Sequence, residues 1–224
     1  MIARTAMALL LLALPCAAPA QQFGPAEFPI KADDGVLMSN HRITAEHAAQ
    51  IEALPGIVVA GNPKGDVTVV QFYDLNCPFC REAAADIDAL IRADRALRLV
   101  FVPYPTLSVQ SVEGGRIELA VRELAPKRFL EFRKRIYAGR GLIDGNRALA
   151  VTDAMDLDRN KVIEIANAAR TTETLKAHAA LGTALKMVAT PSYVIQGVAI
   201  LGHPGLEPLQ QAIKSVRTCK AVVC

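Results

Sequence analysis

Two cysteines separated by two residues lie where an apolar run gives way to a helical pattern. The run Val67–Tyr73 is almost entirely apolar and rich in β-branched residues, which indicates a strand covered on both faces. Cys77 and Cys80 follow it, and the stretch from Pro78 to about Ala93 has alanine, isoleucine and leucine at helical spacing. A strand that leads directly into a helix places Cys77 at the helix N-terminus, where free N–H groups and the helix dipole favour a thiolate. The sequence therefore predicts an α/β fold with reactive sulfur at this junction.

The first twenty residues have the pattern of a secretory signal. Arg4 supplies a positive charge, residues 6–14 are apolar, and Ala18–Ala20 offers small residues for cleavage. The apolar run is shorter than the ~20 residues that a membrane span needs. Lipidation at Cys16 is the alternative, although the residue before it is a proline. We therefore expect a signal peptide over residues 1–20 and an exported protein without stable membrane insertion.

The cysteine count supports an oxidising compartment. Cleavage of the signal would leave four of the five cysteines, namely Cys77, Cys80, Cys219 and Cys224. An even number of exported thiols suits two disulfides. In the tail of residues 219–224 we expect a small local disulfide, with a second exchange pair or an intermolecular bridge as alternatives.

Charge and thiol content bear on partners and cofactors. The formal net charge of the chain is +3, and charges of both signs are mixed along it, so nothing points to nucleic acid or an anionic membrane as a partner. If Cys77 and Cys80 form and break disulfides with other thiols, the reaction needs no metal and no cofactor. The four thiols also permit a second interpretation, a zinc or copper site made of thiolates.

The remaining sequence divides into an arm, a split α/β unit and a helical insertion. An N-terminal arm, residues 21–55, has a hairpin turn at Asp33–Gly35 and a helical pattern over Ala45–Leu54, and either packs on its own core or serves as an oligomer contact. Strand and helix signals alternate over residues 56–106 and return over 184–218. Between them, residues 107–183 read as helical segments: Arg116–Leu124, Pro126–Tyr137, Asp144–Met155, one capped by Asp158 and one from Thr171 or Thr172.

Several motifs together resemble a known family. They are Gly61-Asn-Pro, Val67-Thr-Val-Val-Gln-Phe-Tyr-Asp, Cys77-Pro-Phe-Cys80 and Ala189-Thr-Pro-Ser-Tyr-Val-Ile. With these motifs, the chain from about Ile57 to Val216 resembles the DsbA-like thiol:disulfide oxidoreductases of the thioredoxin superfamily. The resemblance implies a thioredoxin fold with a helical insertion between its βαβ and ββα halves. It also implies a bacterial periplasmic enzyme that exchanges disulfides with client proteins and is recycled by a redox partner.

The resemblance assigns roles to individual residues. Cys77 is the exposed nucleophile, and Cys80 is the buried cysteine that resolves the mixed disulfide. Pro191 matches a cis-proline that lies against the pair. The backbone of Thr190 is then free to pair with an extended client chain. Thr190, Pro191 and Phe79 are thus the expected substrate-binding residues.

Two residues near the pair suggest how its chemistry is tuned. Phe79 cannot donate a hydrogen bond to sulfur as a histidine can, so we expect the pKa of Cys77 to lie below about 8.5 but above the extreme of about 3.5. The reduction potential should be less oxidising than about −120 mV. Gln71 stands where many relatives carry a buried acid, and an amide cannot accept a proton from the resolving thiol. The alternative is that Gln71 is a hydrogen-bonding core amide without a redox role.

Other polar residues carry no motif. We expect His41, His47, His178 and His203 to be surface or capping residues. The basic run from Lys127 to Arg135 is expected to be the solvated face of its helix. The sequence leaves open whether the enzyme oxidises, reduces or, as an oligomer, isomerises disulfides. A thioredoxin-fold binding protein with an idle pair is a further alternative.

Overall fold

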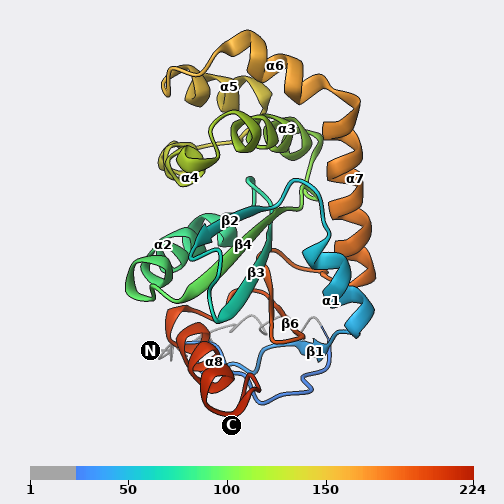
Figure 1. Ribbon diagram of the computed structural model, residues 1–224, viewed down its shortest axis with the longest axis vertical. Coiled ribbons are helices and arrows are strands. Elements are labelled where there is room, and N and C mark those ends of the chain that lie inside the picture. The colour runs from blue at the N-terminus through green and yellow to red at the C-terminus, as the bar shows by residue number, and fades with distance from the viewer. Residues whose placement is uncertain (1–23) are drawn as a thin grey trace, which may run out of the picture.

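A six-stranded mixed sheet forms the centre of the protein. The computed structural model describes residues 24–224 (Figure 1), so the expected signal peptide lies outside the described residues. The strand order is β1-β6-β5-β3-β4-β2, with β3 parallel to β4 and every other pair antiparallel. The strands are β1 (Asn40–Arg42), β2 (Val58–Gly61), β3 (Val67–Tyr73), β4 (Leu97–Pro103), β5 (Ser192–Ile195) and β6 (Val198–Leu201). The predicted strand over Val67–Tyr73 is confirmed as β3, which lies inside the sheet between β5 and β4.

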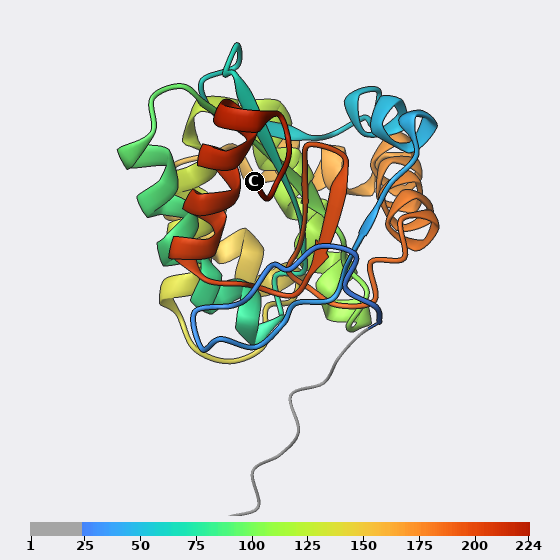
Figure 2. The same ribbon diagram turned by 90° about the horizontal axis from the view of Figure 1, so that it is seen from below.

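Helices cover both faces of this sheet. On one face lie α2 (Pro78–Ala93) and α8 (Leu206–Cys219), and on the other lie α1 (Ala45–Glu52) and α7 (Ala169–Ala184) (Figures 1 and 2). Successive strand residues point to opposite faces. Thus Val69 packs in the core beneath α2 and α8, while Val70 packs in the core beneath α1 and α7. Because helices cover both faces of the sheet, β3 has no solvated side and its sequence is an almost continuous apolar run.

The helical insertion stacks beyond one end of the sheet (Figure 1). Between β4 and α7 it contains α3 (Val109–Leu124), the 3-10 turn η1 (Pro126–Arg128), α4 (Phe129–Ala138), α5 (Gly145–Asp153) and α6 (Arg159–Asn167). Helix α3 begins well before the expected Arg116, because the Ser108 side chain caps it by accepting from the N–H of Ser111. The two glycines of α3 weaken the helical signal in the sequence. At Gly114 a Cβ would lie 3.3 Å from side chains of Leu75 and Ile143, so this glycine permits close packing on the strand–helix junction.

The arm packs on the protein's own sheet. The Asp33–Gly35 turn forms, but it joins a single bridge between Lys31 and Leu37 rather than a regular hairpin. Helix α1 has Thr44 as its N-cap, as predicted. The sequence did not predict β1, which extends the sheet by pairing with β6. Buried Asn40 explains this strand, since its side chain bonds the N–H and the C=O of Phe28 and so fixes the preceding chain against the sheet edge.

The C-terminal tail is closed by a disulfide. Cys219 at the end of α8 is bonded to Cys224, with the two Cα atoms 6.1 Å apart. The expected local disulfide is therefore confirmed, and Cys77 and Cys80 remain as the free thiols of the described residues.

Candidate active site around Cys77

The turn from Asp74 to Cys77 is fixed by side-chain hydrogen bonds to two other segments. One Asp74 oxygen accepts from the N–H groups of Thr106 and Leu107 just beyond β4, both at 2.9 Å. Asn76 bonds the backbone of Ile143 in both directions, at 2.7 Å to its N–H and 2.8 Å to its carbonyl. These bonds join the end of β3 to the chain beyond β4 and to the helical insertion. The start of α2 is thus held by segments far apart in the sequence.

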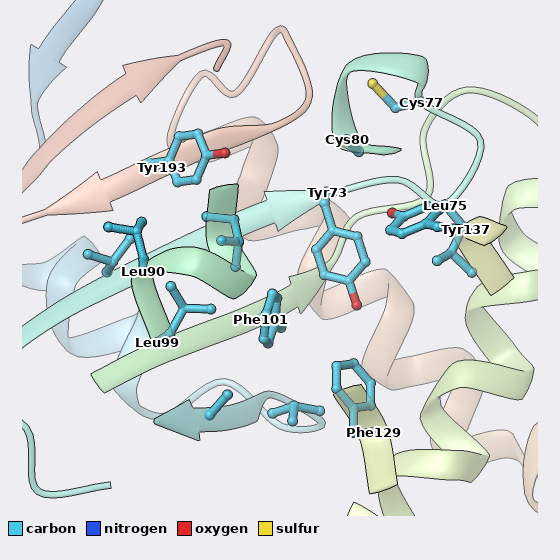
Figure 3. Packing of buried hydrophobic residues seen from close by; sticks show 14 of the residues in the cluster. Tyr73, Leu75, Cys77, Cys80, Leu90, Leu99, Phe101, Phe129, Tyr137 and Tyr193 are labelled. Atoms are coloured by element: carbon cyan, nitrogen blue, oxygen red, sulfur yellow. The ribbon is translucent and has the colours of Figure 1, made fainter. Parts of the chain in front are cut away.

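Both sulfurs lie inside the protein surface. Cys77 is the N-cap of α2 and Pro78 begins the helix, as the sequence predicts. Cys77 is only 4% exposed and Cys80 is 0% exposed, so the expectation of an exposed nucleophile is wrong. The carbonyl of Thr190 accepts a hydrogen bond from Cys77 Sγ at 3.0 Å, which brings the loop before β5 against the sulfur. Figure 3 shows the two cysteines at the start of α2.

The two thiols have opposite acid–base behaviour. A hydrogen bond from the Cys80 side chain lowers the pKa of Cys77 to about 6, against the opposing effect of burial. The Thr190 side chain and the backbone N–H groups of Phe79 and Cys80 add to this lowering. Burial raises the pKa of Cys80 well above its usual range, and the neighbouring Cys77 raises it further. At neutral pH the pair therefore carries one thiolate, on Cys77.

The expected substrate-binding residues surround Cys77. The Thr190–Pro191 peptide bond is cis, as the resemblance implied. The Thr190 carbonyl is not free in the dithiol form, however, because it accepts from the Cys77 thiol. Phe79 points outward and is 63% exposed. Four more large apolar side chains are exposed on segments next to the turn or to Thr190: Leu107, Val109, Leu142 and Val188. We call these four side chains and Phe79 the apolar rim.

Gln71 is fully buried in β3. Its Nε2 donates to the Tyr193 hydroxyl at 3.2 Å, and its Oε1 has no hydrogen-bond partner among the described residues. Tyr193 is also 2.8 Å from His203 Nδ1, and His203 Nε2 is 2.9 Å from Asp86 Oδ2. Gln71 therefore belongs to a hydrogen-bonded chain, which the sequence did not reveal.

A second polar cluster is buried behind the pair. Arg133 is 5% exposed and its guanidinium lies 4.1 Å from the ring centre of Tyr73 and 4.2 Å from that of Phe101. The Tyr73 hydroxyl donates to Glu118 at 2.6 Å. Burial raises the pKa of Glu118 to about 7, although Arg133 and the Tyr73 hydrogen bond act in the opposite direction. The expectation that the whole basic run is solvated is therefore wrong for Arg133.

The helical spacing of α4 could have identified Arg133. Its neighbours Phe129, Phe132 and Ile136 are buried, and Arg133 lies on the same stripe at the i, i+3, i+4, i+7 positions. The aromatic rings beside the guanidinium provide the cation–π contacts that make its burial tolerable. Charge alone predicts a solvated side chain, whereas the helical period places Arg133 among the buried residues of α4.

Two histidines differ from expectation in the same way. His178 is 0% exposed, with its ring nitrogens 2.8 Å from the Pro103 carbonyl and 2.6 Å from the Pro55 carbonyl. His203 is 15% exposed at its side chain and links Tyr193 to Asp86. The prediction of surface or capping residues is therefore wrong for these two.

Two further observations concern metals and membranes. Among residues 24–224, no three His, Cys, Asp or Glu side chains lie together as metal ligands would. Within that part of the chain, no helix is long and apolar enough to cross a membrane.

Comparison with known proteins agrees with this architecture. A model of the family described as thioredoxin matches residues 53–215. A thioredoxin-like oxidoreductase from Silicibacter pomeroyi DSS-3 superposes with a TM-score of 0.71 and 30% identity, over 76% of this chain and 97% of the other. No curated protein matches the chain.

Two more distant structures share the fold. The thiol-disulfide exchange protein alpha-DsbA2 from Wolbachia pipientis has a TM-score of 0.71 and 21% identity, covering 77% of this chain and 92% of its own. The catalytic domain of ScsC from Proteus mirabilis has a TM-score of 0.66 and 20% identity, covering 75% and 94%. The expected thioredoxin fold, with helices between its two halves, is confirmed.

Proposed function

The chain belongs to the thioredoxin family, and we propose that it is an exported thiol:disulfide oxidoreductase that exchanges disulfides with client proteins through Cys77 and Cys80. The observation that carries the proposal is the position of Cys77 as the N-cap of α2, with its Sγ 3.0 Å from the Thr190 carbonyl, and its pKa is lowered to about 6 there. A thiolate is the attacking species in disulfide exchange, and one that forms near neutral pH is what the reaction needs.

The reaction on a client disulfide runs in two steps. First, the Cys77 thiolate attacks one client sulfur; a mixed disulfide forms and the second client sulfur leaves as a thiolate. Next, Cys80 loses its proton and attacks Cys77 Sγ, so the mixed disulfide breaks and the client is released reduced. The enzyme is left with a Cys77–Cys80 disulfide, having given up two electrons. The reverse sequence oxidises a client dithiol, and a redox partner restores the starting form.

Thr190 links ionisation of Cys77 to client binding. Its carbonyl accepts a hydrogen bond that only the protonated thiol can donate. When Cys77 becomes a thiolate, that donor is gone and the carbonyl becomes free to accept an N–H from an extended client chain. The form of the enzyme that is ready to react is thus also the form that is ready to bind.

The apolar rim supports a client that is an unfolded or extended polypeptide. Phe79 is next to Pro78, and Val188 precedes Thr190 by two residues. Exposed apolar side chains grouped around a site are typical of protein-binding surfaces. Leu142→Ser should therefore weaken reaction with a protein client while leaving reaction with a small disulfide unchanged. Val59→Ser on β2, whose side chain is also exposed and does not belong to the rim, is the control.

Reduction of insulin by the mature protein tests the proposal. Cys77→Ser should abolish activity, and Cys80→Ser should accumulate mixed disulfides on non-reducing gels. Cys219→Ser is the control, because it removes a cysteine outside the proposed pair and should leave activity intact. Activity that survives Cys77→Ser would contradict the proposal.

Export is proposed together with the activity. The pattern of residues 1–20 supports periplasmic location, and a periplasmic thioredoxin-like protein from Salmonella enterica serovar Typhimurium shares the fold at 19% identity with a TM-score of 0.63. Mass spectrometry of the protein in a periplasmic fraction should find Gln21 as its first residue.

We also propose the domain division expected from the sequence, namely the arm (21–55), the split thioredoxin unit (56–106 and 184–218), the insertion (107–183) and the tail (219–224). The oligomeric isomerase is not adopted, because apolar arm residues such as Ile30 and Ile51 pack in the chain's own cores.

A further inference from the structure

The loop between α4 and α5 is bonded to the residues on both sides of the active pair. Asn76 directly precedes the pair, and Arg81 directly follows it. At one end of the loop, Asn76 bonds the N–H of Ile143 at 2.7 Å and its carbonyl at 2.8 Å. At the other end, Nη1 of Arg81 donates to the Gly139 carbonyl at 2.5 Å. Residues 139–143, which we call the recognition loop, are therefore held against the active turn at both ends.

Two arginines take the place of a cap at the end of α4. An α-helix leaves its last carbonyls without partners inside the helix. Arg81 donates to the Tyr137 carbonyl, and Nη2 of Arg147 donates to the Ile136 carbonyl at 3.2 Å. The guanidinium carbon of Arg81 also lies 5.5 Å from the centre of the Tyr137 ring. Cations at this end of a helix are favoured by its dipole, so Arg81 joins α2 firmly to the end of α4.

The middle of the recognition loop is fixed by Arg147 on α5. Its Nη1 donates to the carbonyls of Arg140, of Gly141 at 2.8 Å and of Leu142 at 3.3 Å. At Gly139 a Cβ would lie 2.5 Å from Nη2 of Arg147, so the glycine there permits the close approach. These bonds give the loop a defined backbone conformation.

The fixed backbone presents one exposed apolar side chain beside the active turn. Leu142 is 57% exposed, whereas its neighbour Ile143 is 0% exposed and packs in the core. Because Ile143 is bonded to the residue that precedes Cys77, Leu142 lies close to the reactive sulfur in the fold. A side chain on a loop that is already ordered can bind a partner without the entropic cost of ordering that loop.

We propose that the recognition loop selects clients, and that Arg81 is the positioning residue that fixes the loop beside Cys77. This inference rests on the proposed exchange function and names its client class. The class is an extended polypeptide with a large apolar side chain next to its reactive cysteine. Packing of that side chain on Leu142 holds the client sulfur at Cys77. Arg81 acts through the loop and takes no part in the chemistry at sulfur.

The test compares two activated peptides with a small disulfide. Each short peptide carries one cysteine joined through a disulfide to thionitrobenzoate, and the residue before that cysteine is leucine in one peptide and serine in the other. The Cys77 thiolate attacks the peptide sulfur, a mixed disulfide forms, and thionitrobenzoate leaves as a coloured thiolate. The symmetric disulfide of thionitrobenzoate reports attack by Cys77 without a peptide.

Four variants of the reduced mature protein are compared with the wild type. Arg81→Met removes the donors but keeps an apolar side chain of similar length, and Arg81→Lys restores a donor. Arg147→Met frees the loop from α5. Arg92→Met is the matched control, because it makes the same substitution at an exposed arginine in the last turn of α2.

The wild type should have a lower apparent KM for the leucine peptide than for the serine peptide. Arg81→Met should raise the KM for the leucine peptide by about fivefold to tenfold, less than the loss of a fully buried leucine contact would give. The limiting rate and the reaction with the small disulfide should stay unchanged, because only binding is affected. Arg81→Lys should recover most of the loss. Arg147→Met should raise the same KM, and it decides the matter if Arg81→Met fails to fold.

A double substitution shows whether Arg81 acts through Leu142. In a Leu142→Ser background, Arg81→Met should change the KM for the leucine peptide little, since both substitutions remove one and the same contact. A full additional rise in KM there would contradict the proposed route.

The remaining outcomes distinguish this inference from the exchange function on which it rests. If the wild type releases no thionitrobenzoate from any of the three substrates, the exchange function fails and this inference fails with it. If the small disulfide reacts but Arg81→Met has the same KM values as Arg92→Met, only client selection by the loop is refuted. A loss in Arg81→Met that is equal for all three substrates also refutes it, because Arg81 would then act on Cys77 itself.

Discussion

Glu118→Gln should remove a large pH-dependent loss of stability. In the native protein the carboxyl is fully buried, accepts from Tyr73 at 2.6 Å, and has its second oxygen without a partner among the described residues. Burial raises its pKa from an ordinary value of 4.5 to about 7, so the folded protein holds a proton that the unfolded chain releases. Glutamine has nearly the same shape and keeps an acceptor for Tyr73, but it never ionises.

The sign and size follow from this shift in pKa. Between about pH 4.5 and 7 the folded state binds more protons than the unfolded state, so the free energy of unfolding falls as pH rises. The stabilising contribution is complete below the unfolded pKa and is lost as pH rises through the folded one. At 1.36 kcal/mol per pKa unit, the full loss is about 3 kcal/mol. That is a large share of the total stability of a typical domain, about 5–15 kcal/mol.

Urea unfolding at about pH 5 and about pH 8 measures this quantity. The wild type should lose about 3 kcal/mol more between the two pH values than Glu118→Gln does, because all other titrating groups are common to both proteins and cancel. Glu123→Gln is the control: it lies on the same helix, is exposed, and pairs with Arg170 at the surface. A difference between wild type and Glu118→Gln that is the same at both pH values would refute the reasoning.

Three further predictions concern the active pair, the tail and the packing of α7. Phe79→His adds a donor near Cys77, so redox titration against glutathione should give a more oxidising potential than that of the wild type, which should lie below about −120 mV; an unchanged potential contradicts this. Cys219→Ser opens a disulfide with a sequence separation of 5. Because a disulfide that closes a loop of about 15 residues contributes about 3 kcal/mol, urea unfolding should show a smaller loss of unfolding free energy than that. Gly182→Ala places a Cβ 2.4 Å from the Tyr104 ring and should cost about 1–3 kcal/mol of unfolding free energy, whereas an unchanged value would show that the ring moves aside.

The strand–helix junction was predictable because its signals are local. The ranges Val67–Tyr73 and Pro78–Ala93 are as the sequence predicts, since a continuous apolar run, a proline at the helix start and an alanine-rich stripe all lie within thirty residues. Helix α3 and strand β1 were harder to predict from the sequence. Glycines weaken the helical pattern of α3, and β1 depends on bonds from Asn40 to the chain before it.

The environments of the buried polar residues were not predictable in the same way, because each depends on a distant partner. Glu118 and Tyr73 are separated by 45 positions, and Tyr193 meets Gln71 across 122. A charged side chain is normally solvated unless such partners offset its desolvation. For Arg133 the helical spacing of α4 indicates a buried position, but the sequence does not show the aromatic rings of Tyr73 and Phe101 that make its burial tolerable.

The position of Gln71 bears on the acid–base chemistry of the pair. A carboxyl at that position could accept the Cys80 proton, and the amide of Gln71 cannot. Cys77 needs no such help, because its own ionisation is favoured at the start of α2 and its pKa is already about 6. The two thiols therefore differ in what controls their ionisation: Cys80, Thr190 and the N–H groups at the start of α2 favour the thiolate of Cys77, whereas burial opposes that of Cys80. Because the Cys80 side chain contributes most to the low pKa of Cys77, a substitution of Cys80 should slow attack by Cys77 as well as abolish resolution.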